Sequence, residues 1–122
     1  MPEPVSKRFS RQQRLPNPAA FKYVFDKPCK VSSRNFTILA RANQRNQARL
    51  GLAVPKRQIR RAVARNRIKR LVRESFREHQ ADLAGLDIVV LARAGAGREK
   101  NRDILASLAE QWDRLRQTCE KS

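Results

Sequence analysis

The side chains in this chain that are best suited to chemistry are the arginines and lysines between Lys56 and Arg77. This stretch carries ten Lys or Arg residues and one acid, Glu74. Guanidinium and ammonium groups bind phosphates through charge and several N–H donors, and they can do so without reading base edges. The residue types and their density therefore predict a phosphate-rich partner.

A helical period separates these cations from an apolar stripe. At about 3.6 residues per turn, one side of a helix expected from Arg61 to Gln80 would face a core. That side carries Ala64, Ile68, Leu71, Val72, Ser75, Phe76 and His79. The other side carries a row formed by Asn66, Arg70, Arg73 and Arg77. Solvated helix faces usually mix both signs of charge, so this row favours a nucleic acid or an anionic membrane as partner.

The overall charge leads to the same class of partner. The chain has 122 residues and a formal net charge of +17, which fits one domain that binds a polyanion. No apolar run approaches the length needed to span a bilayer, and no signal peptide is recognisable. We therefore expect a cytoplasmic protein without membrane contact. Its two cysteines, Cys29 and Cys119, match no zinc spacing and are expected to be reduced.

Residues that could catalyse a reaction are scarce. The only histidine, His79, lies on the apolar stripe, where a structural role is expected. The acids are dispersed, no Ser or Cys stands in a nucleophile motif, and no Gly-rich phosphate loop is present. We therefore predict no catalytic residue and no metal site in the chain. Any reacting groups would come from a partner.

The elements that must position the basic row can be expected in chain order. Residues 1–14 would form a mobile basic arm, and residues 15–119 a single RNA-binding domain. A first helix would begin after Asn17, a capping residue followed by Pro18, and end before Pro28.

The strands expected on either side of the basic helix predict an α+β fold. Residues 31–41 and 50–54 read as strands of an antiparallel hairpin. The apolar run 86–92 suggests a strand covered on both faces, and a last helix would occupy residues 100–119, after a glycine loop. Together they predict a mixed, mainly antiparallel sheet of about four strands packed by three helices, an α/β sandwich.

Several segments resemble the bacterial ribonuclease P protein subunit, the protein component of RNase P. Arg65-Asn66-Arg67, within AVARNRIKRLVRESFR, resembles the RNR motif of that family. The first helix of that family is resembled by the segment that contains Arg14-Leu15, Phe21 and Val24-Phe25. Its early strands are resembled by the segment that runs from SRNF to Leu39. The segment RLGLAVPKR resembles the strand that leads into the basic loop, and DIVV the last strand. The resemblance covers roughly residues 12–118.

This resemblance implies a ribonucleoprotein endoribonuclease that removes the 5′ leader from precursor tRNA. In such an enzyme the catalytic RNA subunit carries the chemistry and requires Mg²⁺, whereas the protein needs no cofactor of its own. The resemblance also implies the topology of a small-subunit ribosomal protein with a left-handed βαβ crossover, which is a rare exception to the usual hand.

Two groups of site residues follow from the resemblance. Binding of the catalytic RNA is expected from Lys56, Arg57, Arg61, Arg65, Asn66, Arg67, Lys69, Arg70 and Arg73. A separate cleft for the leader is expected from Phe21, Lys22, Phe25, Arg34, Thr37 and Leu39. The two phenylalanines can be core or cleft wall, and one of them could be core while the other is cleft wall. Aromatic walls with nearby cations suit single-stranded RNA, since base stacking tolerates any sequence.

Three other functions share parts of this pattern. A ribosomal or other structural RNA-binding protein would have the same charge and fold class but would not need a leader cleft. A DNA reader would keep more Asn, Gln or Ser among its arginines to contact bases. A nuclease acting alone would need a catalytic constellation. No protein partner is indicated.

Overall fold

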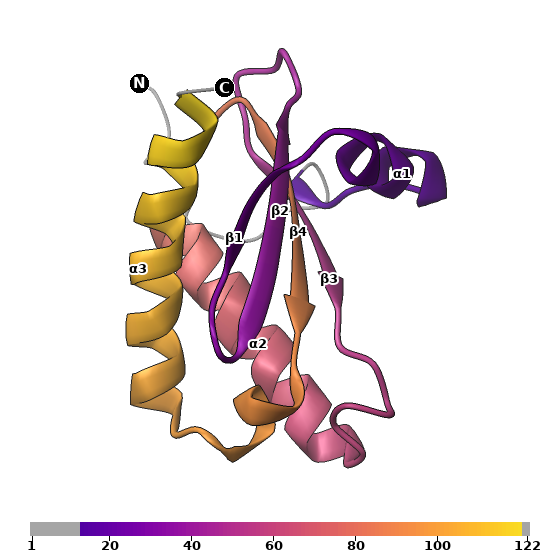
Figure 1. Cartoon of the computed structure of the whole chain (residues 1–122), viewed down its shortest axis with the longest axis vertical. Helices are drawn as coiled ribbons and strands as arrows, with labels where there is room; N and C mark the ends of the chain where they lie inside the picture. The colour runs from indigo at the N-terminus through magenta and orange to yellow at the C-terminus, as the bar shows by residue number, and fades with distance from the viewer. Residues whose placement is uncertain (1–12, 121–122) are drawn as a thin grey trace, which may run out of the picture.

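A computed structural model describes residues 13–120, so all but the last two residues of the expected arm lie outside the described residues. The elements in chain order are α1 (Pro18–Asp26), β1 (Cys29–Ser32), β2 (Phe36–Ala42), β3 (Arg49–Ala53), α2 (Ala62–His79), β4 (Leu86–Ala92), the 3-10 helix η2 (Ala94–Arg98) and α3 (Asn101–Glu120). The strands form one sheet in the order β1-β2-β4-β3 (Figure 1). The predicted α+β class, with a four-stranded mixed sheet and three helices, is confirmed.

The pairing of the strands differs from the expected hairpin. A turn at residues 33–35 divides the expected first strand into β1 and β2, which pair antiparallel with each other. β4 then lies between β2 and β3, antiparallel to the first and parallel to the second. The predicted hairpin of residues 31–41 with 50–54 is therefore wrong. The nearly continuous apolar run of β4 explains the arrangement, because such a strand is most stable in the sheet centre, covered on both faces.

The parallel pair β3 and β4 is joined through α2, which is the βαβ unit that the resemblance implies. The hand of this crossover stays a prediction. α2 and α3 pack on one face of the sheet, and α1 lies on the opposite side from α3 (Figure 1). The basic helix and the first helix thus pack in different cores, and their side chains line a common cavity beside β3.

The main core lies between the sheet and the pair α2 and α3. Phe36, Ile38 and Ile88 from the strands meet Phe76 and Trp112 from the helices, and all are almost completely buried. Phe76 and Trp112 pack edge to face, with ring centroids 6.3 Å apart. The indole N–H of Trp112 donates to Ser75 Oγ over 2.8 Å, so the polar group on the buried face of α2 is satisfied.

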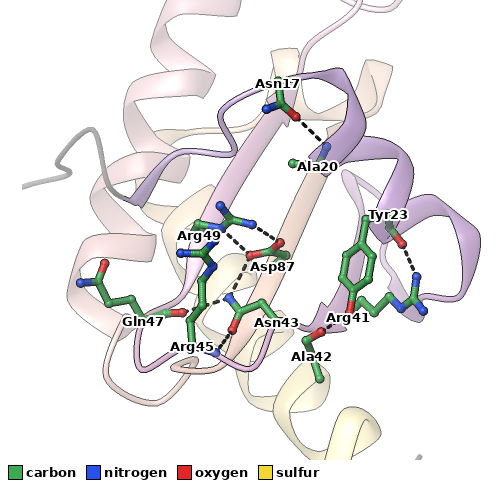
Figure 2. A network of polar contacts seen from close by, with 10 residues as sticks. All are labelled: Asn17, Ala20, Tyr23, Arg41, Ala42, Asn43, Arg45, Gln47, Arg49 and Asp87. Carbon is green, nitrogen blue, oxygen red and sulfur yellow. Dashed lines mark hydrogen bonds and ion pairs between the residues drawn. The ribbon is translucent and has the colours of Figure 1, made fainter.

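A smaller core lies under α1, formed by Leu15, Val24, Leu39 and Val89. Tyr23 of α1 and Arg41 of β2 make hydrogen bonds that hold α1 against the sheet (Figure 2). The Tyr23 hydroxyl donates to the Ala42 carbonyl over 2.6 Å, and Arg41 Nη1 donates to the Tyr23 carbonyl over 2.8 Å. The Arg41 guanidinium also lies 3.9 Å from the centre of the Tyr23 ring, within the range of a cation–π interaction.

Candidate RNA-binding surfaces

α2 presents its cations as predicted because its opposite face is built into the core. Ile68, Leu71, Val72, Ser75 and Phe76 are buried. Arg61 and Gln80 flank the helix as its caps, so the predicted bounds are confirmed. Of the predicted row, Asn66 and Arg70 are exposed, whereas Arg73 and Arg77 are half-buried and the Nε atom of each is buried.

The two arginines of the RNR motif make hydrogen bonds within the protein. Arg65 Nη1 donates to the carbonyls of Ile59, at 3.0 Å, and Arg60, at 2.7 Å. It therefore holds the loop that leads into α2, in which Ile59 is buried. Arg67 Nη1 donates to Asn101 Oδ1 over 2.6 Å, which ties α2 to the start of α3. Each guanidinium has five N–H donors, so both keep donors for a ligand.

The predicted catalytic-RNA contacts are not equally accessible. The exposed members are Lys56, Arg57, Arg61, Asn66 and Arg70, whereas Arg65, Arg67, Lys69 and Arg73 are half-buried. Arg60, which was not among the predicted contacts, is also exposed in the lead-in loop. Its position in the same run of charge is the signal that could have identified it. The lead-in loop and the outer face of α2 thus form one basic surface.

Lys69 and Arg73 lie on the side of α2 that faces β3. With Arg14, Phe21 and Gly51 they line a cavity of about 190 Å³ that has no acidic residue in its lining. Burial, and then the charge of Arg14, lower the pKa of Arg73. The Nε atom of Arg73 is buried without a hydrogen-bond partner among the described residues. A bound anion would reduce the repulsion between these cations.

A second cavity, of about 570 Å³, lies beside α1. Its lining is mostly apolar and consists of Leu15, Pro16, Asn17, Pro18, Phe21, Lys22 and Phe25. The Asn17 side chain caps the helix by accepting from the Ala20 N–H over 3.0 Å, as predicted. Phe25 is 46% exposed, so it is a wall of the cavity.

Phe21 serves as both core and wall. It is half-buried against the small core under α1 and also lines the cavity beside Phe25. Its ring lies on Gly51, where an added Cβ would stand 2.5 Å from Phe21 Cζ. The absence of a side chain at Gly51 therefore lets α1 approach the sheet closely.

The remaining cleft candidates are more dispersed than expected. Lys22 lines the cavity beside α1 together with Phe21 and Phe25, but Arg34, Thr37 and Leu39 do not line it. Leu39 is on the α1 face of the sheet, as expected, yet α1 covers it and it is only 7% exposed. Thr37 is half-buried opposite Leu91 on β4, and Leu91 is itself half-buried. Leu91 was missed because its strand read as covered on both faces.

The candidate nucleophiles and acids do not form a reactive group. His79 Nδ1 donates to the Ser75 carbonyl over 2.8 Å, which is a structural contact at the end of α2. Burial, and then a hydrogen bond with Cys29, raise the pKa of Cys119, whereas a nucleophilic thiol needs a lowered pKa. Within residues 13–120, no three His, Cys, Asp or Glu side chains gather where they could hold a metal ion. None of the helices described is long and apolar enough to cross a membrane.

These surfaces define the class of protein: a small α+β domain with a basic helix for a polyanion on one side of its sheet and an apolar cavity on the other. The Ribonuclease P family model matches residues 9–116. The chain is 47% identical over 114 residues to the ribonuclease P protein component of Nitrosococcus oceani, covering 93% of this chain and 96% of that one. It is 49% identical over 112 residues to the component of Pseudomonas putida, covering 91% and 84%.

Solved structures agree with the sequence relatives. The RNase P protein of Staphylococcus aureus matches with a TM-score of 0.75 and 33% identity, over 80% of this chain and 90% of that one. The protein from Thermotoga maritima matches with a TM-score of 0.70 and 29% identity, over 78% and 90%. The chain belongs to the ribonuclease P protein family. It is therefore an RNA-binding protein of tRNA processing, a component of an endoribonuclease.

Proposed function

We propose that this chain assists removal of the 5′ leader from precursor tRNA by binding the catalytic RNA of ribonuclease P. The observation that carries the proposal is the basic surface of α2 and its lead-in loop, in a chain of this family. The RNA subunit would hold the Mg²⁺ ions and carry out phosphodiester hydrolysis. The protein would supply phosphate contacts and help to choose the substrate.

The exposed cations of the lead-in loop and of α2 suit an RNA backbone. Arg57, Arg61 and Arg70 offer planar guanidiniums that can meet phosphate oxygens with two parallel hydrogen bonds. Proteins recognise RNA helices mostly through the shape and the backbone of the RNA, so a rigid row of arginines is suited to bind one. Arg65 and Arg67 contribute by fixing the lead-in loop and the position of α2.

The cavity beside α1 suits a short stretch of single-stranded leader. Phe25 offers an exposed ring for base stacking, and Lys22 places a cation in the same lining. Such sites tolerate many sequences, because every base has a face that can stack. The leader would then be bound on the side of the sheet away from α3.

Reconstitution tests the proposed function directly. We expect the protein to restore cleavage of precursor tRNA by a bacterial ribonuclease P RNA at a Mg²⁺ concentration too low for that RNA alone. Protein freed of RNA should cleave nothing. Arg70→Ala should weaken binding of the catalytic RNA by about 1–3 kcal/mol, because it removes a charge-assisted hydrogen bond. Cleavage by the RNA-free protein, or no stimulation of the RNA, would contradict the proposal.

Phe25→Ala tests the leader site without disturbing the core. Loss of one stacking contact costs about 1–3 kcal/mol, so the holoenzyme should bind precursor tRNA roughly tenfold more weakly. Binding of mature tRNA, which lacks a leader, should be unchanged. Phe21→Ala is less suitable because Phe21 also packs on Gly51. Equal losses for both tRNAs would remove the leader assignment, and circular dichroism serves as the folding control.

A further inference from the structure

A third cationic site lies away from the exposed row of α2, where the β2–β3 loop meets the chain before α1. It is a cavity of about 630 Å³ lined by Arg14, Pro16, Gln44, Arg45, Asn46, Gln47 and Arg49. The lining holds three arginines and no acid. We call it the arginine pocket. Its volume is in the range that accommodates a nucleotide-sized ligand.

The loop that carries Arg45 is held in one conformation. Asn43 Nδ2 donates to the Gln47 carbonyl over 3.0 Å and to Asp87 Oδ1 over 2.8 Å (Figure 2). Asn43 Oδ1 accepts from the Arg45 N–H over 2.8 Å. Gln44 has a φ of 57°, in the left-handed region that residues other than glycine rarely adopt. Such local strain, held by surrounding contacts, is common at ligand sites.

The charges of the pocket are only partly neutralised. Arg49 donates through Nε and Nη2 to the two oxygens of Asp87, at 2.8 and 2.7 Å. This pairing fixes the Arg49 guanidinium and leaves Nη1 without a hydrogen bond to the rest of the described chain. Arg45 is exposed, and its side chain extends from the loop toward Arg49 in Figure 2. Asp87 offsets the charge of Arg49, whereas the Arg45 guanidinium has no acidic partner among the described residues.

We propose that the arginine pocket binds a phosphate group of an RNA strand, as a contact separate from the α2 surface and the leader cavity. Arginine N–H groups match phosphate oxygens, and the side-chain amides of Gln44, Asn46 and Gln47 can bond sugar or base atoms. Arg14 lines both this pocket and the cavity of Lys69 and Arg73. A strand that follows Arg14 would therefore meet cations from both sites. The inference rests on the proposed function only in taking RNA as the partner.

Arg45→Ala tests the pocket, because the Arg45 side chain lies on the surface and makes no hydrogen bond within residues 13–120. The matched control is Arg114→Ala, which removes the same charge from an exposed position on α3. Affinity is measured against salt concentration for two ligands: the catalytic RNA alone, and precursor tRNA bound by the assembled holoenzyme. Unchanged thermal unfolding would show that each variant is folded.

We expect Arg45→Ala to weaken binding of one of the two ligands about three- to tenfold. It should also make the logarithmic salt dependence shallower by about one, whereas Arg114→Ala should change neither quantity. Weaker binding of the catalytic RNA by Arg45→Ala would support the pocket and show that the phosphate belongs to the catalytic RNA. Weaker binding of precursor tRNA alone would also support the pocket and show that the phosphate belongs to the substrate. If both variants behave like the parent protein on both ligands, the pocket is not a binding site. Failure of the parent protein to bind either RNA would instead refute the proposed function.

Discussion

The affinity of this chain for the catalytic RNA is expected to fall about a thousandfold or more when monovalent salt rises from about 50 to about 200 mM. The lead-in loop and α2 expose Lys56, Arg57, Arg61 and Arg70, with Lys69 and Arg73 half-buried beside them. Six such phosphate contacts release several condensed counterions from the RNA, and added salt opposes that release. The net charge of +17 adds attraction at longer range.

Equilibrium binding to labelled catalytic RNA at several salt concentrations measures this effect. Arg70→Ala should reduce the logarithmic slope by about one, because it removes one phosphate contact. Arg114→Ala removes the same charge from the outer side of α3 and should leave the slope unchanged. A nearly flat dependence in the parent protein would show that phosphate contacts do not dominate. Equal slope changes in both variants would place the interface elsewhere.

The basic helix could be predicted because its signal is local. Ile68, Leu71, Val72 and Phe76 repeat at the helical period, and their burial forces the intervening cations outward. The strand pairing depends on contacts far apart in the chain. The closeness of residues 31–41 and 50–54 in the sequence predicts a hairpin, whereas the apolar β4 separates β2 from β3. The alternation of apolar and polar residues along a strand does not determine where that strand lies within the sheet.

The candidate sites show the same division. The spacing of Arg65 and Arg67 placed them on α2, but their donation to loop carbonyls and to Asn101 depends on the tertiary fold. Leu39 alternates correctly with its neighbours, yet the position of α1 decides that it is covered. The arginine pocket gathers Arg14, Arg45 and Arg49 from separate segments. No spacing rule relates these three residues, so only the folded chain brings them together.

Asp87→Ala is expected to lower the free energy of unfolding by about 3–5 kcal/mol, because it leaves a largely buried charge without its partner. The Asp87 side chain is 2% exposed and that of Arg49 is 15% exposed. Arg49 and Asp87 are direct neighbours on the parallel strands β3 and β4, and the carboxylate accepts two hydrogen bonds from Arg49 and one from Asn43. The hydrogen bond with Asp87 raises the pKa of Arg49, so the pair favours the charged guanidinium.

Urea denaturation followed by circular dichroism measures this loss. Asp113→Ala is the matched control, since its ion pair with Arg116 is exposed and should contribute no more than about 1 kcal/mol. Replacing both partners, as Arg49→Met with Asp87→Leu, should recover much of the stability, because no unpaired charge then remains in the sheet. Asp87→Ala should also loosen Asn43, and with it the loop that carries Arg45. A loss no larger than that of Asp113→Ala would show that Asp87 is not the anchor of this end of the sheet.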